Sequence, residues 1–138
     1  MRLHRQQARR SGAAAVEAAI VLPVALLLIY GIMSGAIMVL VTDEVATVSR
    51  EGARWGSVRG YTYSRSTNRP AATAADIQNF CLAQGVTLDP SKMTVNVYWT
   101  TSNMMGNYVT VEVHYQWEGL AIFSGQEFVS RSTMLVSY

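Results

Sequence analysis

The longest hydrophobic pattern of the chain lies near its N-terminus. Residues 13–42 contain only one Asp, Glu, Lys or Arg, which is Glu17. A helix over Ile20–Val41 would rise about 1.5 Å per residue and span roughly 33 Å, which matches a hydrocarbon core of about 30 Å. We therefore predict one transmembrane helix over residues 13–41, and no other stretch is long or apolar enough to span a membrane.

Beyond residue 41 the pattern becomes that of an amphipathic helix. Apolar and small residues recur at steps of four and three, namely Val41, Val45, Val48, Gly52 and Trp55. The charged residues Asp43, Arg50 and Arg54 fall on the opposite face. We expect the helix to continue to about Val58, as a helical stem over residues 42–59.

Residues 60–138 predict a small head with mixed structure. Gly60–Pro70 is rich in turn-forming residues and has no period, so we expect a connecting loop there. Thr73 and Asp76 indicate the start of a short helix, with Ile77, Phe80, Cys81 and Gln84 on one face. Gly85 would end this helix.

Three strands are expected after this helix. Hydrophobic residues alternate with polar ones over 93–99 and again over 109–117, which predicts an antiparallel hairpin. A weaker alternation over 128–138 predicts a third strand. Since a head of about 70 residues is marginally stable alone, the stem should cover the apolar face of the sheet. The expected fold class is α+β: a long N-terminal helix packed on a small antiparallel sheet, with one extra short helix.

Charge predicts the direction of insertion. The basic leader, residues 1–12, carries Arg2, Arg5, Arg9 and Arg10 without an acid, whereas the rest of the chain has seven Lys plus Arg and nine Asp plus Glu. Positive residues stay on the cytoplasmic side, so we expect a cytoplasmic N-terminus and an extracytoplasmic head. A nucleic-acid partner would need a larger basic face with interleaved aromatic residues, which this leader lacks.

The head offers little for catalysis, metal binding or a cofactor. The only cysteine, Cys81, has the apolar neighbours Phe80 and Leu82, and we expect a buried thiol rather than a nucleophile. His114 lies on the polar face of its strand, and the head has no second histidine to complete a zinc site. We find no Gly-x-Ser-x-Gly or phosphate-binding loop. No enzymatic activity, metal or cofactor is therefore expected.

The residues ahead of the hydrophobic helix allow three kinds of N-terminal signal. A secretory signal has a shorter apolar core, although Ser34-Gly35-Ala36 could supply a cleavage site. A twin-arginine signal would need apolar residues after Arg9-Arg10, where Ser11-Gly12-Ala13 stands. The third kind of signal is indicated by Gly12 and Glu17, which are five positions apart. A basic leader precedes them and an uncharged hydrophobic span follows them. This order resembles that of type IV prepilins and pseudopilins.

Three segments make the resemblance narrower. Gly12–Pro23, Gly31–Gly35 and Ser49–Trp55 are similar to the TadE-like pseudopilins of tight-adherence (Flp, type IVc) pilus systems, over about the first 60 residues. The resemblance implies that a prepilin peptidase cleaves between Gly12 and Ala13. Glu17 would then pair with the new Ala13 amine of a neighbouring subunit. If Glu17 did not form that pair, it would be an acidic residue near the end of the membrane span whose carboxylate reaches the membrane–water interface.

The resemblance also implies a function and partners. It implies a structural minor pilin or pseudopilin that crosses the inner membrane once and contacts lipid. Such a protein can also be incorporated into a surface pilus. Its partners would be the prepilin peptidase, other pilins or pseudopilins and the inner-membrane assembly platform. The alternative is a permanently anchored single-pass protein whose extracytoplasmic head binds a ligand or partner. Cleavage after Gly12 separates these two hypotheses.

One proline and four glycines are candidates for helix packing. Pro23 lacks an N–H, so the helix is expected to bend or loosen there. Gly31 and Gly35 lie one turn apart, which lets another helix approach closely, although this spacing also arises by chance. Gly52 and Gly56 repeat the spacing in the stem, where they either admit a neighbour or weaken the helix.

Overall fold

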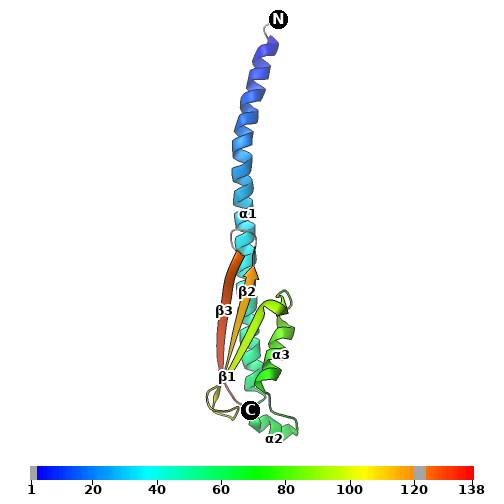
Figure 1. The fold of residues 1–138 in the computed structure, drawn as a ribbon, viewed down its shortest axis with the longest axis vertical. Helices are drawn as coiled ribbons and strands as arrows, with labels where there is room; N and C mark the ends of the chain where they lie inside the picture. The colour runs from blue at the N-terminus through cyan, green and yellow to red at the C-terminus, as the bar shows by residue number, and fades with distance from the viewer. Residues whose placement is uncertain (1–2, 120–123) are drawn as a thin grey trace. The chain divides into compact units, whose positions relative to one another are not determined.

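The computed structural model describes residues 3–119 and 124–138, with side chains for residues 12–119 and 125–138. Helix α1 covers Leu3–Ser57 and is not interrupted at Pro23 (Figure 1). Contacts divide the chain after Ile37 into two units, which are described separately: the helical unit up to Ile37, and the head unit Met38–Tyr138.

The described residues of the head unit form the end of α1, two shorter helices, a 3-10 turn and one sheet (Figure 1). Its further elements are α2 (Tyr61–Thr67), α3 (Ala74–Gln84), the 3-10 turn η1 (Pro90–Lys92), β1 (Met93–Trp99), β2 (Tyr108–Glu118) and β3 (Ser124–Leu135). The strands form one antiparallel sheet in the order β1-β2-β3. The α+β class and the antiparallel hairpin of β1 and β2 are therefore confirmed.

The sheet has one apolar and one polar face because side chains alternate along each strand. Val95 lies opposite Val113, and Val109, Val111 and Val113 are completely buried. The polar face carries Glu112 opposite Arg131, Thr110 opposite Thr133 and His114 opposite Val129. The hydrophobic alternation of the sequence thus sets which face turns toward the core.

The end of α1 and α3 pack against the apolar face of the sheet. Val45, Val48 and Ala53 of α1 join Ile77 and Cys81 of α3 in one buried cluster with the sheet valines. The charged residues Asp43, Arg50 and Arg54 are exposed, as the stem pattern predicts. Ser49 is also buried, and its hydroxyl lies 2.9 Å from that of Ser130 on β3. The end of α1 therefore supplies apolar side chains that complete the hydrophobic core on this face of the sheet.

Helix α3 begins and ends at the predicted residues. The Thr73 hydroxyl accepts a hydrogen bond from the Asp76 N–H, and the Asp76 carboxylate accepts from the Thr73 N–H, so the two residues form a capping box. The Thr73 backbone and hydroxyl bonds hold the pKa of Asp76 below its usual value. Gly85 follows the last turn. Gln84 was expected on the packed face but is exposed.

The prediction of a loop over Gly60–Pro70 is wrong, because Tyr61–Thr67 forms α2. The Thr67 hydroxyl donates to the Tyr63 carbonyl inside the helix, and Asn68 adopts a left-handed conformation with φ 55° after its last turn. The Gly60 N–H donates to the Tyr138 carbonyl, which fixes the start of the segment. Contacts with residues distant in sequence therefore order a segment whose composition favours a turn.

The third strand is shifted toward the N-terminus relative to its predicted range of 128–138. It covers Ser124–Leu135. The residues after it bind elsewhere: the Val136 N–H donates to the Asn107 carbonyl, and the Ser137 N–H donates to the Ser57 carbonyl at the end of α1. These bonds attach the last residues to the β1–β2 connection and to α1.

Candidate functional site on the N-terminal helix

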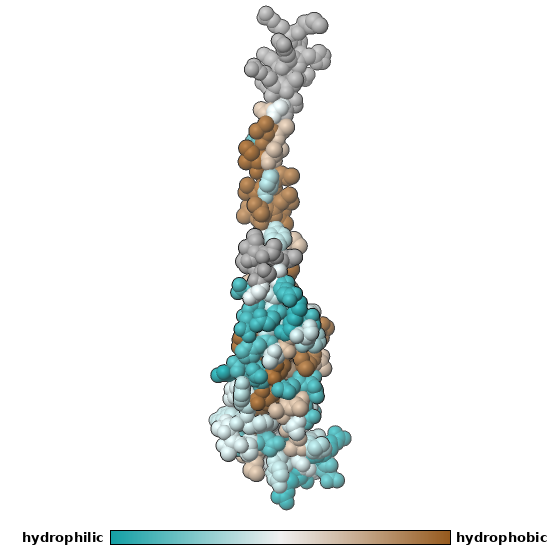
Figure 2. All heavy atoms as spheres, in the orientation of Figure 1, coloured by the Kyte–Doolittle hydropathy of each residue, from teal (hydrophilic) through white to brown (hydrophobic). Residues whose placement is uncertain are grey.

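The helical unit has an almost entirely apolar and exposed surface. Every side chain of residues 12–29 is exposed, and Val16, Ile20 and Leu28 each expose more than 60% of their surface. Figure 2 shows hydrophobic residues over this part of α1 and mostly hydrophilic ones over the visible face of the head. Soluble monomers rarely expose an apolar patch larger than a few hundred Å².

The helix that carries this apolar surface is also long enough to cross a membrane. Among the described residues, one helix, Gly12–Ser57, is long and apolar enough to cross a membrane. The exposed apolar side chains are expected for a surface in contact with lipid rather than water. The chain thus has the features of a single-pass membrane protein.

Gly12, Ala13 and Glu17 all lie within α1 and are exposed. A Cβ added at Gly12 would meet nothing within 4 Å. None of the ion pairs among the described residues involves Glu17. Met1, Arg2 and the side chains of the other leader arginines lie outside the described residues. Nothing in the described part of the chain therefore covers the predicted cleavage position or neutralises the Glu17 carboxylate.

Glu17 begins a row of residues on one face of the helix. The row follows steps of four and three residues through Val21, Val24, Leu28, Gly31 and Gly35. Gly35 lies 18 positions after Glu17, which is five turns at 3.6 residues per turn, so both lie on the same face. A groove of about 280 Å³ runs along it and is lined by Val21, Val24 and Leu28 together with Ile20 and Ala25. We call Glu17, Val21, Val24, Leu28, Gly31 and Gly35 the Glu17 face.

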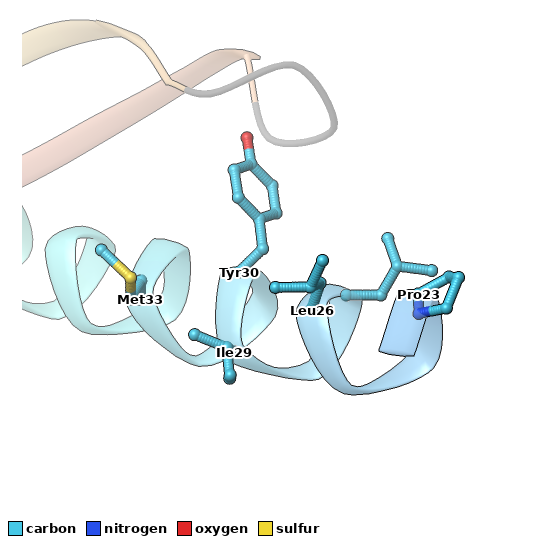
Figure 3. Close-up of a pocket in the computed structure, with 6 residues that line it drawn as sticks. Pro23, Leu26, Ile29, Tyr30 and Met33 are labelled. Carbon is cyan, nitrogen blue, oxygen red and sulfur yellow. The ribbon is translucent and has the colours of Figure 1, made fainter. Parts of the chain in front are cut away.

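A second groove lies on another face of the same unit (Figure 3). It measures about 520 Å³ and is lined by Pro23, Leu26, Leu27, Ile29, Tyr30 and Met33. Pro23 is six residues from Glu17, about 120° around the helix at 100° per residue. The sequence predicts Pro23 as a packing position, but it does not predict the other residues of this groove or the valines and the leucine of the Glu17 face. Their steps of three and four residues were the available signal.

The same part of the chain matches a known family. Residues 12–54 match the model of the TadE-like protein family. This segment is TadE-like. The match begins at Gly12 and includes Ala13, Glu17, Pro23 and the four candidate glycines. No curated protein and no solved structure matches the chain.

The family match assigns the general role. The match covers 43 of the 138 residues and supports a pilin-like protein associated with the tight-adherence pilus. The family is structural rather than enzymatic. The match ends at Arg54, and most of the head lies beyond it.

The two glycines near the end of the TadE-like segment differ from those of the helical unit. A Cβ at Gly52 would collide with the Cys81 Sγ and lie 3.3 Å from Val111 Cγ1. A Cβ at Gly56 would lie 2.7 Å from Ile77 Cδ1. Gly52 and Gly56 thus let α3 and β2 of the same chain approach α1. No described residue lies within 4 Å of a Cβ at Gly31 or Gly35.

The head residues considered for chemistry have structural surroundings. Cys81 is a buried free thiol, as predicted, and burial raises its pKa to about 11. His114 lies on the polar face of β2 but is not fully solvated: its Nδ1 is 3.0 Å from Glu127 Oε1 and its Nε2 is 3.7 Å from Glu112 Oε1. Within the described residues, no group of three or more His, Cys, Asp or Glu could hold a metal ion.

Proposed function

We propose that this TadE-like protein is a minor pilin or pseudopilin that helps to assemble a tight-adherence pilus. In this proposal, residues 1–12 lie in the cytoplasm, the helix crosses the inner membrane, and the head is extracytoplasmic. A prepilin peptidase removes the leader after Gly12. One observation carries the proposal: Glu17 is the only charged residue of 13–42, is exposed without an ion pair to any described side chain, and shares one helical face with Gly31 and Gly35.

Cleavage would create the cation that Glu17 lacks. Hydrolysis after Gly12 leaves a protonated amino group on Ala13, four residues before the carboxylate. An isolated charge in the apolar membrane is costly, and an acid–amine pair between two subunits reduces that cost. Because Glu17 has neighbours of little polarity, the pairing would align one helix with another more strictly than apolar contacts do.

The Glu17 face suits a partner helix. Steps of four and three residues are the spacing of helices that pack with a left-handed crossing, and glycines allow close approach of backbones in a membrane. We propose that other pilins or pseudopilins occupy this face during assembly, while lipid contacts the rest of the helix. The inner-membrane assembly platform would be the partner that brings the subunits together.

The first experiment examines the N-terminus of the protein recovered from membranes. We expect intact mass and N-terminal sequencing to show a chain that begins at Ala13. Gly12→Val should prevent cleavage, and because its side chain meets nothing in the described structure, the loss would arise at the peptidase. Gly31→Val is the matched control and should be cleaved normally. A wild-type chain that keeps its leader in cells with the peptidase would contradict the proposal and favour the anchored binding protein.

The second experiment separates subunit pairing from insertion. Glu17→Gln keeps the size of the side chain and removes its charge, so it should insert and be cleaved. Cross-linking to other pilins and the number of pili should fall. Glu17→Asp, which keeps the charge, should retain more of both. Normal cross-linking and piliation by a fully cleaved Glu17→Gln protein would exclude the pairing role.

A further inference from the structure

A cleft lined by charged and aromatic side chains lies in the head, beyond the residues that match the TadE-like family. It measures about 240 Å³ and is formed by the end of α1, by α2 and by the start of α3. Trp55 and Arg59, Tyr63 of α2, Arg69 and Asp76 of α3 line it. The cleft is separate from the Glu17 face and does not depend on cleavage of the leader.

Two arginines give the cleft a positive charge. Residues 52–75 contain four arginines and no acid. Neither Arg59 nor Arg69 forms an ion pair with a described carboxylate. Among the described residues, Asp76 is the one acid that lines the cleft. Two cations against one anion favour a negatively charged ligand.

Arg59 is held in place before any ligand binds. Its guanidinium carbon lies 4.4 Å from the centroid of the Trp55 ring, which in turn stacks on Phe80 at 5.2 Å. The Arg59 Nη1 donates to the Trp55 carbonyl at 3.4 Å, and the Arg59 carbonyl accepts from the Ala72 N–H. A guanidinium has five N–H donors, so most of them remain available for a planar oxyanion.

Asp76 adds an acceptor of a different kind. Its Oδ2 accepts hydrogen bonds from the N–H and the hydroxyl of Thr73, at 2.9 and 2.7 Å. The same bonds keep the pKa of the carboxyl low, so it remains ionised at neutral pH. The other oxygen, Oδ1, has no partner among the described residues. It can accept a bond from a hydroxyl group, whereas it would repel a second carboxylate.

We propose that the cleft binds a hydroxy acid of about the size of one sugar unit, such as a uronic acid. Its carboxylate is held by Arg59 and Arg69, and one of its hydroxyl groups donates to Asp76. A neutral sugar would leave both arginines without a counter-charge, and a plain carboxylate would leave Asp76 without a donor. The volume is below the usual 300–1,000 Å³ of drug-sized sites, which fits a single small ring.

The experiment measures binding to the full chain in detergent micelles by calorimetry at constant ionic strength. The probes are glucuronate, glucose and acetate. We expect glucuronate to bind at least about tenfold more tightly than either of the others, because each lacks one half of the recognition. Equal affinity for glucuronate and glucose, or for glucuronate and acetate, would overturn the proposal. If polygalacturonate competes with glucuronate for the cleft, the ligand comes from a polysaccharide. If polygalacturonate does not compete, the ligand is a free acid.

Two arginine variants test the site itself. Arg69→Gln should weaken glucuronate binding about tenfold, since one charge-assisted contact is lost. Arg65→Gln is the matched control, because Arg65 lies in α2 and does not line the cleft, so the substitution removes the same charge outside the site. It should change the affinity for glucuronate less than twofold. Arg69 is exposed, and thermal unfolding should show that both variants remain folded. Equal losses in both variants would show a general charge effect and no site.

Discussion

The contact between Gly52 and α3 yields a prediction that tests how the stem holds the head. In Gly52→Ala, the new methyl group would overlap the Cys81 Sγ and press against Val111 at 3.3 Å. Both Gly52 and Cys81 are buried and lie within helices, so neither backbone moves away easily. The substitution should therefore destabilise the head, although alanine is the better helix former.

The magnitude follows from two opposing effects. Alanine is favoured over glycine in a helix by about 1 kcal/mol. An extra methyl group in a filled core costs about 1–3 kcal/mol, and the overlap with sulfur places this site in the upper part of that range. The net loss should be about 1–2 kcal/mol. For a unit of about 100 residues, this lowers Tm by about 5–15 °C.

The assay is thermal unfolding of the full chain in micelles, followed by near-ultraviolet circular dichroism of the head tryptophans. Gly31→Ala is the control, because its methyl group meets nothing and should leave Tm of the head unchanged. The double variant Gly52→Ala/Cys81→Ala removes the sulfur that causes the overlap. It should recover most of the lost stability, with a coupling of about 0.5–3 kcal/mol between the two positions. An unchanged Tm for Gly52→Ala, or additive losses in the double variant, would refute the packing argument.

Three further predictions concern the cap of α3, the buried thiol and the topology. Thr73→Ala removes the hydroxyl acceptor of the capping box and should cost about 1 kcal/mol in chemical denaturation, whereas Thr73→Ser should cost little. Cys81 should resist maleimide in the folded protein and react after unfolding. Because folding raises the pKa of its thiol from 9.0 to about 11, the stability that the buried neutral thiol contributes should be intact below pH 9 and be lost as pH rises through 11. Denaturation measured as a function of pH checks this. A periplasm-dependent reporter enzyme fused after Tyr138 should be active and a cytoplasm-dependent one inactive, and the reverse would contradict the proposed orientation.

The parts of the fold that sequence predicted best have strong hydrophobic periods. The alternation through Val109, Val111 and Val113 identified β2 and its buried face, because only one face of this sheet packs on helices. The steps through Val45 and Val48 identified the stem for the same reason. A local signal was equally effective at α3, where Thr73 reaches its own partner three residues later.

The parts that sequence missed depend on contacts distant along the chain. Helix α2 has no buried residue and no apolar period, and its start is fixed by Tyr138, which lies at the other end of the head. The end of β3 depends on Asn107 and Ser57, which bind the residues that follow the strand. Arg59 lies at the end of the predicted stem and Arg69 lies in the segment expected to be a loop, and no local pattern brings them to the same cleft as Asp76. Such placements become visible only when the chain is folded.

The glycine pairs of α1 share a spacing but have different surroundings. A Cβ at Gly52 or Gly56 would press into α3, because that neighbour is already present in the chain. A Cβ at Gly31 or Gly35 would meet no atom within 4 Å in the part of the chain that the structure describes. Each glycine costs a helix about 1 kcal/mol relative to alanine, and no contact with a described residue of the same subunit offsets that cost at Gly31 or Gly35. A partner helix on the Glu17 face would reverse that balance, since glycines let two membrane helices approach closely. Gly31→Ala and Gly35→Ala should therefore leave unfolding of the head unchanged while they reduce cross-linking between subunits.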